Sequence, residues 1–245
     1  MIINAAGGLS TLLNAAKGMS AQKDRINVSA NNVANFSSVA YKAKSAQLAN
    51  GGPGLGVHIA GVRTTTSQGP LMKTDSPTDI AISGAGFFLV ENEDGEAFFT
   101  RAGNFTKDKD GFLRTASGEF LMGDAGRIQI PADTASFSVG GDGVVTVVDQ
   151  DGNAVNAGRI NLALFENEQA LASEGGGLYS APAAAGAPQL TRPGQNGAGT
   201  LAGGALEISN VDYISEAVAT MLASRSFQAN AKAFQTADEI LQTLI

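Results

Sequence analysis

Apolar residues near the amino terminus recur every three or four positions. Only Lys23 interrupts the series, and two of its members, Ala16 and Ala30, are small. This spacing is typical of a heptad seam, in which small side chains allow a second helix to approach closely. The pattern predicts a helix over about residues 5–34, either paired along the seam or placed in an ordinary globular core. The seam consists of Leu9, Leu12, Ala16, Met19, Ile26, Ala30 and Val33.

A second long helix is predicted at the carboxyl end. Residues 211–245 contain no Gly or Pro and are rich in Ala, Gln, Glu and Leu, which favour helix. Their apolar residues fall on two faces that change over near residues 224–226. We expect the first face to meet the amino-terminal helix and the second to meet another molecule; one broad stripe bent around a single partner is the alternative. The first face includes Ile214, Val218 and Met221, and the second includes Phe227, Phe234, Leu241 and Leu244.

Polar residues mark the inner ends of both predicted helices. Three asparagines end the first helix, where an Asn side chain satisfies free carbonyl groups and accepts a left-handed backbone. Ser209 or Asn210 is expected to cap the second helix, so that Asp212 lies favourably in its first turn. The three asparagines are Asn31, Asn32 and Asn35.

The residues between the helices predict β structure. Short runs of alternating apolar and polar residues are separated by Gly-bearing turns at a spacing of about 8 to 12 residues, typical of an all-β sandwich or barrel. A parallel sheet would need intervening helices, and none is indicated. Residues 44–56 are rich in Gly and predict a loop, whereas residues 57–64 predict a strand. Gly84 and Gly86 allow a tight turn before a strand in which Phe87 or its neighbour enters the core.

The sequence therefore predicts an α+β fold in which long terminal helices pair as a coiled-coil-like domain around an all-β, sandwich-like or barrel-like middle. We expect residues 1–43 and 206–245 to form the helical domain. Residues 44–70 are expected to form an extended connection, and residues 71–205 the β-rich domain.

Charge and composition exclude several classes of function. The net charge is −7 and the 16 Lys and Arg residues are scattered, so the chain lacks the basic stripe of a nucleic-acid-binding protein. There is no cysteine, which removes thiolate zinc sites and cysteine nucleophiles. No segment reaches the roughly 18 apolar residues of a membrane-spanning helix. The first residues also lack the basic segment and apolar run of a secretory signal peptide.

No catalytic or metal-binding constellation is apparent either. The only histidine, His58, lies in a predicted strand without a nucleophile or carboxylate pattern around it. An EF-hand loop counted from Gly111 would place Thr106 and Ser117 where carboxylates are required. A glycosidase would need two carboxylates positioned in a cleft, whereas the acidic residues here lie mostly in turns. We therefore expect no enzyme activity, no cofactor and no metal.

Three blocks of the sequence resemble the bacterial flagellar rod and hook protein family. The first is similar to the family signature ANNLAN…GFK, with Ala40 where the family usually has Gly and Tyr41 in place of Phe. Because Ala tolerates a positive φ less well than Gly, this turn is expected to differ slightly. The matching residues are Asn31, Asn32, Ala34, Asn35 and Lys42.

The other two blocks follow in the order of the family. The middle block is similar to the segments GxGFF and TRxGxF, and its Arg101 is expected to brace the turn before it. The last block is similar to SNVDxxxE…QANAK…DE, with Ser224 in place of Gln and Phe227 in place of Tyr. The turn residues that match are Gly84, Gly86, Phe87 and Arg101 in the middle block and Ser209, Asn210 and Asp212 in the last.

This resemblance implies a structural protein that stacks helically into the tubular rod and hook of the flagellum and transmits torque. It implies partners among copies of the same chain, other rod and hook proteins, and the flagellar export apparatus. It also implies export without a cleaved signal peptide and a place in the periplasm-spanning rod of the basal body. Two apolar seams that the chain itself leaves uncovered agree with this role, because a heterologous contact that does not close generates a helical tube. The seam and both faces of the second helix are the expected subunit-packing residues.

The lengths of the chain and of the segment after its first helix indicate which type of rod or hook subunit it resembles. A hook subunit normally has an additional large outer domain, for which 245 residues leave no room. The distal rod protein normally has an extra stretch between the amino-terminal helix and the β domain, where we expect only a short loop. The sequence thus favours a proximal rod subunit over a distal one, with a compact hook subunit third and a monomeric β-rich binding module as an alternative outside the family.

Overall fold

The computed structural model describes residues 2–52 and 56–243, which form two compact units. The helical unit falls within Met1–Phe36, Lys42–Thr65 and Val211–Ile245, and the β unit consists of Ser37–Tyr41 and Thr66–Asn210. The predicted α+β class is confirmed, because a long helix at each end of the chain pairs with the other and the middle of the chain is rich in strands.

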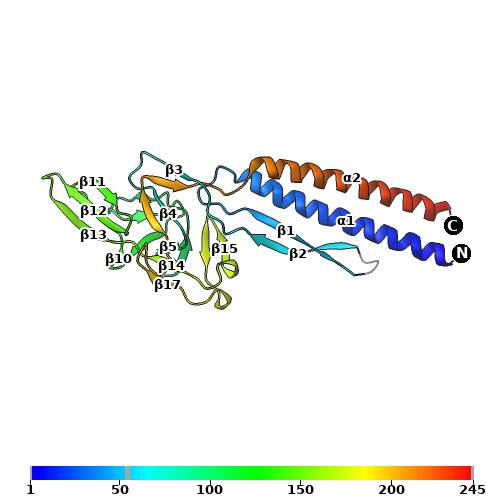
Figure 1. The fold of residues 1–245 in the computed structure, drawn as a ribbon, viewed down its shortest axis with the longest axis horizontal. Coiled ribbons are helices and arrows are strands. Elements are labelled where there is room, and N and C mark those ends of the chain that lie inside the picture. The colour runs from blue at the N-terminus through cyan, green and yellow to red at the C-terminus, as the bar shows by residue number, and fades with distance from the viewer. Residues whose placement is uncertain (1, 53–55, 244–245) are drawn as a thin grey trace. The chain divides into compact units, whose positions relative to one another are not determined.

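Two antiparallel helices and a β-hairpin build the helical unit (Figure 1). Helix α1 (Ile2–Ala34) and helix α2 (Tyr213–Thr243) lie side by side. Small residues allow the close approach: Ala223 and Ala237 of α2 are buried, and a Cβ atom added to Gly18 would lie 2.8 Å from the side-chain nitrogen of Asn230. The pairing of the terminal helices therefore depends on small side chains more than on large apolar ones.

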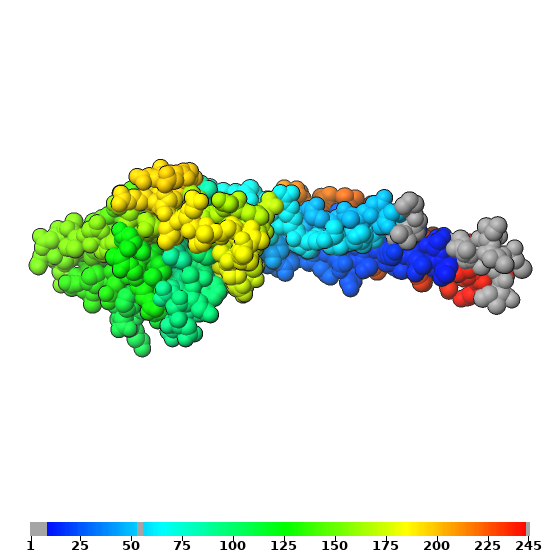
Figure 2. Space-filling view, turned by 90° about the horizontal axis from the view of Figure 1, so that it is seen from below, coloured from blue at the N-terminus to red at the C-terminus, as the bar shows by residue number. Residues whose placement is uncertain are grey.

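The hairpin consists of β1 (Lys44–Asn50) and β2 (Val57–Thr64), which pair antiparallel and lie along α1 (Figure 2). The prediction of a loop over residues 44–56 is wrong for residues 44–50. The sequence KSAQLAN lacks the β-branched and aromatic residues that favour strands, so its strand conformation comes from pairing with β2 and from contact with α1.

The strands of the β unit are short and pair antiparallel throughout the named ladders. A ten-stranded sheet has the main order β15-β16-β6-β5-β9-β8-β7, with β10, β14 and β17 paired off this path. A three-stranded sheet has the order β11-β12-β13, and two further pairs join β18 to β4 and β19 to β3. The bounds are β3 Leu71–Lys73, β4 Ile80–Ser83, β5 Phe87–Glu91, β6 Ala97–Thr100, β7 Thr106–Lys107, β8 Leu113–Arg114, β9 Phe120–Gly123, β10 Gly126–Arg127, β11 Thr134–Val139, β12 Val144–Asp149, β13 Ala154–Arg159, β14 Leu162–Leu164, β15 Ala172–Gly175, β16 Leu178–Ser180, β17 Gln189–Thr191, β18 Thr200–Gly203 and β19 Ala205–Glu207, with short 3-10 helices at Glu168–Ala170 and Ala183–Ala185.

The segment around the GxGFF motif positions two hydrophobic clusters of the β unit. Gly84 has φ of 117°, so the turn after β4 needs a backbone conformation that favours glycine. In the strand that follows, Phe88 is fully buried in the main core, whereas Phe87 contacts a smaller cluster that includes Phe99. Both phenylalanines are therefore buried, on opposite faces of β5, where the prediction required only one of them.

Ala40 has a left-handed backbone, although alanine tolerates this conformation less well than glycine. Its φ is 53°, and its backbone N–H donates to the carbonyl of Glu207 at 2.7 Å. The neighbouring residue Val39 forms a bridge with Ile208, so residues 37–41 extend the β unit. The turn therefore holds an alanine in a conformation that favours glycine, at the steric cost that a Cβ atom brings there.

Arg101 and Glu207 form a buried ion pair in the β unit. Arg101 Nη1 lies 3.3 Å from Glu207 Oε2, and the Glu207 side chain is 0% exposed. The other carboxylate oxygen accepts a hydrogen bond of 2.8 Å from the backbone N–H of Gly69, and the guanidinium also lies over the ring of Phe87, 5.4 Å from its centroid. Arg101 therefore joins segments far apart in the sequence, which corrects the expectation that it braces a local turn.

Candidate assembly surfaces

The apolar seam predicted on α1 lies off the face that packs within the chain. Leu9 is 56% exposed and Ala30 is also exposed, while the other seam residues are half-buried. The buried positions of α1 are small or polar, which is why hydrophobic periodicity did not reveal them. They are Ala15, Gly18, Ala21, Ser29 and Asn32.

The first apolar face of α2 is exposed, so the expectation that it meets α1 is wrong. Ile214 is 74% exposed and Met221 is 65% exposed, and their neighbours Val218 and Leu222 are exposed as well. At 100° per residue, Ile214 and Met221 lie on the side of the helix opposite the buried Ala223. We call Ile214, Val218, Met221 and Leu222 the outer stripe.

The second apolar face of α2 lies on the side that faces α1, which also reverses the prediction. Phe227, Phe234 and Leu241 are half-buried. They follow the same helical face as Ala223, Asn230 and Ala237, of which Asn230 approaches Gly18 of α1. Glu216 and Asn230 also lie on this face. These polar residues interrupt the apolar series, so hydrophobic periodicity alone did not identify the face as continuous. Leu244 lies outside the described residues.

Asp212 caps α2, whereas the sequence favoured Ser209 or Asn210. Its carboxylate accepts hydrogen bonds from the backbone N–H groups of Ile214, at 3.0 Å, and Ser215, at 3.3 Å, and from the Ser215 hydroxyl at 2.6 Å. The Ser215 hydroxyl and then the Ser215 N–H hold the pKa of Asp212 below its ordinary value of 3.8. Ser209 is instead buried in the β unit, where Asn210 Nδ2 donates to the carbonyl of Ser67 at 2.8 Å.

The cap predicts a pH dependence at the start of α2. Because the pKa of Asp212 is lower in the folded chain, its carboxylate stabilises the helix start above the unfolded pKa, and this contribution is lost as pH falls through the folded value. We expect the protection of the Ile214 and Ser215 amides from hydrogen exchange to fall as pH decreases from about 5 to about 2, relative to amides in the middle of α2. Asp212→Asn should remove this dependence, whereas Asp238→Asn, near the other end of the helix, should keep it. Constant protection in the unmodified chain would contradict the assignment.

The three asparagines at the end of α1 have different roles. Asn35 Nδ2 donates to the carbonyl of Asn31 at 2.9 Å, as expected of a residue that ends a helix. Asn32 is 0% exposed, and its side chain bonds both backbone groups of Lys44 and the carboxylate of Glu216. Lys42, the last residue of the motif, is buried.

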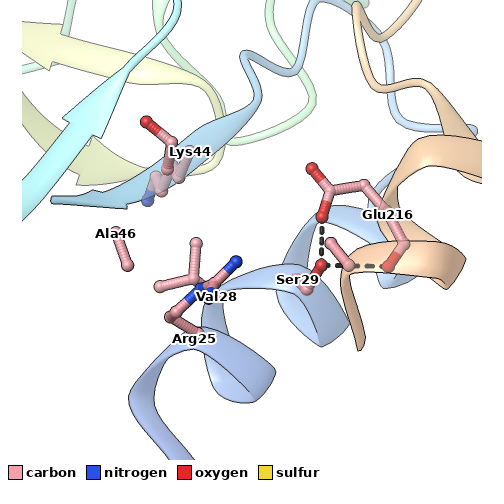
Figure 3. A pocket seen from close by; sticks show the side chains of 8 residues that line it. Arg25, Val28, Ser29, Lys44, Ala46 and Glu216 are labelled. Atoms are coloured by element: carbon pink, nitrogen blue, oxygen red, sulfur yellow. Dashed lines mark hydrogen bonds between the residues drawn. The ribbon is translucent and has the colours of Figure 1, made fainter. Parts of the chain in front are cut away.

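A hollow lies next to these bonds, between α1, β1 and the first turns of α2 (Figure 3). Glu216 points from α2 toward Ser29 of α1, while Arg25 and Lys44 border the other side. The remaining lining residues are Val28, Ser45, Ala46 and Ala219. Among the residues that the structure describes, no three His, Cys, Asp or Glu side chains are grouped so as to hold a metal ion. No helix in the same part of the chain is long and apolar enough to cross a membrane.

Three family models match separate parts of the chain. Residues 81–147 match the flagellar hook protein FlgE/F/G D1 domain, residues 202–245 match the C-terminal part of the flagellar basal body rod FlgEFG proteins, and residues 12–42 match the flagella basal body rod protein. The first of these regions lies in the β unit, and the matched ends include most of the helical unit.

Curated relatives are similar over nearly their whole length. The flagellar basal-body rod protein FlgG of Bacillus subtilis is 35% identical over 97% of this chain and 98% of its own length. FlgG of Caulobacter vibrioides is 34% identical over 96% of this chain and 97% of its own length. FlgF, a second flagellar basal-body rod protein of Caulobacter vibrioides, is 31% identical over 90% of each chain.

Proposed function

Because this chain belongs to the FlgE/FlgF/FlgG family of flagellar rod and hook proteins, we propose that it is a structural subunit of the basal-body rod, of the FlgG type. FlgG of Caulobacter vibrioides is 34% identical to this chain, whereas FlgF of the same organism is 31% identical over less of both chains, which supports FlgG over FlgF. The relatives named above are basal-body rod proteins, so a structural role is favoured over an enzyme or a monomeric binding module.

The observation that carries the proposal is the outer stripe. Four large apolar side chains are exposed together over the first turns of α2, and Leu9 and Leu13 are exposed at the far end of α1. Since α1 and α2 are antiparallel, these two exposed sets lie at opposite ends of the helical unit and cannot meet within one chain. Packing between copies would bury both sets, and a contact between two different surfaces propagates into a helical assembly.

The hairpin supports a distal rather than a proximal position in the rod. The proximal interpretation depended on a short loop after the amino-terminal helix, but residues 44–64 contain β1 and β2. The resemblance implies that the distal rod protein has an extra stretch at this place, and the hairpin fits that description. Within this proposal the chain passes through the flagellar export apparatus without a cleaved signal peptide and spans the periplasm as part of the rod.

Truncation tests whether the helical unit is needed for assembly. A chain that ends at Ser209 lacks α2 and the outer stripe, and we expect it to be absent from isolated basal bodies while its β unit still unfolds cooperatively. The same epitope tag on the full-length chain provides the control for detection. Incorporation of the truncated chain at the level of the full-length chain would contradict a role for α2 in assembly and favour a monomeric module.

A further inference from the structure

The side chain of Asn32 connects three elements of the helical unit. Its Nδ2 donates to the carbonyl of Lys44 at 2.7 Å, and its Oδ1 accepts from the N–H of Lys44 at 2.9 Å. The same Nδ2 also donates to Glu216 Oε1 at 2.8 Å. One fully buried amide thus joins the last turns of α1, the first residue of β1 and the first turn of α2.

Glu216 extends this connection to a second residue of α1. The Ser29 hydroxyl contacts Glu216 Oε2 and lies 3.2 Å from the backbone carbonyl of Glu216 (Figure 3). Each oxygen of the carboxylate therefore has its own partner on α1. We call Ser29, Asn32, Lys44 and Glu216 the three-way latch.

The hairpin depends on such support because it has only two strands. An isolated two-stranded hairpin is at best marginally stable in water, and packing against a helix is one way to stabilise it. The pairing of β1 with β2 starts at Lys44 and Thr64, so the residue that Asn32 holds is the first residue of the hairpin. The residues on its outward side, among them Gln47 and His58, are exposed and provide no core of their own.

From these contacts we infer that Asn32 and Glu216 are positioning residues, through which docking of the first turn of α2 fixes the hairpin against α1. When α2 is docked, the carboxylate of Glu216 orients the Asn32 amide toward the backbone of Lys44. When α2 is absent, Asn32 loses that acceptor and the hairpin loses its fixed starting point. The state of the carboxyl-terminal helix is thereby transmitted to a segment more than 150 positions earlier in the sequence.

Hydrogen exchange of the purified full-length chain tests this coupling. Glu216→Ala removes both acceptors, and Asn32→Asp removes the donor that serves Lys44 and Glu216. We expect either change to increase exchange of the amides of residues 44–50 and 57–64 at least about tenfold. Glu216→Ala removes the hydrogen bond from Asn32 to a charged carboxylate, and Asn32→Asp replaces it with repulsion between two carboxylates. Exchange of the strands of the β unit should stay unchanged. Glu216→Gln retains an acceptor for Asn32 and a donor for Ser29, so this conservative variant should keep the hairpin protected.

Asn31→Asp is the matched control, because it makes the same chemical change at the exposed neighbouring position. It should leave the hairpin as well protected as in the unmodified chain. The inference is overturned if the hairpin amides exchange freely in the unmodified chain, if both latch variants leave them protected, or if exchange increases equally throughout the chain.

The inference concerns one chain and stands independently of assembly. If the rod function is correct as well, Glu216→Ala should also reduce incorporation into basal bodies, and Glu216→Gln should restore it. Loss of hairpin protection with normal incorporation would confirm the latch and show that assembly does not require it. Normal protection together with failed incorporation would overturn the latch while leaving the proposed function intact.

Discussion

Met221→Glu is expected to abolish incorporation of the chain into the rod while leaving the chain folded. Met221 is 65% exposed, so a carboxylate at this position stays in water in the single chain. Met and Glu also have similar helix propensities, so α2 itself should persist. In the assembly the same carboxylate would lie within an apolar contact, where an unpaired charge is strongly unfavourable.

Two further variants test whether the outer stripe acts as one surface. Ile214→Glu, at the most exposed residue of the stripe, should have the same effect on incorporation. Gln235→Glu adds the same charge at an exposed polar position farther along α2 and should assemble normally. Incorporation is measured by the amount of tagged chain in isolated basal bodies, and folding by the free energy of unfolding in urea. If both stripe variants assemble normally, the outer stripe is not an assembly surface.

The second large effect is expected at the buried ion pair of the β unit. Arg101→Met removes the guanidinium from the carboxylate of Glu207, whose side chain is 0% exposed. Breaking a buried pair in this way typically lowers the free energy of unfolding by about 3 to 5 kcal/mol. The midpoint of urea unfolding of the purified chain should decrease accordingly.

An exposed ion pair in the same unit provides the control. Arg127 Nη2 lies 2.8 Å from Glu91 Oε1, with both side chains partly exposed, so Arg127→Met should lower the unfolding free energy by about 1 kcal/mol or less. The double variant Arg101→Met/Glu207→Gln should recover part of the loss, because it removes the buried negative charge and keeps an oxygen for the N–H of Gly69. Equal effects of Arg101→Met and Arg127→Met would show that burial of the pair does not determine its contribution.

Sequence patterns predicted the elements of this fold better than the contacts between them. Long uninterrupted helical patterns and glycine-bearing turns are local signals, and both terminal helices and the β-rich middle were predicted from them. The strand at residues 44–50 was missed because its stability comes from α1 and β2, which a local pattern does not include. The turn at Ala40 was expected to differ from that of the family because alanine tolerates a positive φ less well than glycine, yet Ala40 has φ of 53°.

The faces of α2 were assigned in reverse for a physical reason. Hydrophobic periodicity identifies the most apolar face and assumes that it is the buried one. Here the face toward α1 contains Glu216, Ala223 and Asn230, which pair through hydrogen bonds and close approach, while the outer stripe has the larger apolar side chains. If the outer stripe packs between copies, as we propose, the most apolar face of α2 is the one left exposed in a single chain, and the usual inference fails there.

The contacts of the three-way latch also could not be predicted from the sequence. Asn32 was noted as one of three asparagines at a helix end, and Glu216 as one match in the last block. Their contact joins residues 184 positions apart, and without the fold no pattern distinguishes Asn32 from the exposed Asn31. Likewise, the preference for a proximal position depended on the supposed loop after α1, and the hairpin removes that support.

The position of the chain within isolated basal bodies tests the central claim most directly. A short epitope tag in the exposed turn at Asp94 and Gly95, between β5 and β6, leaves both terminal helices intact. Gold-labelled antibody viewed by electron microscopy should then mark the rod, along its distal part, and the label should disappear with Met221→Glu. Label on the hook alone, or tagged chain recovered only outside basal bodies from motile cells, would contradict a function as a rod subunit.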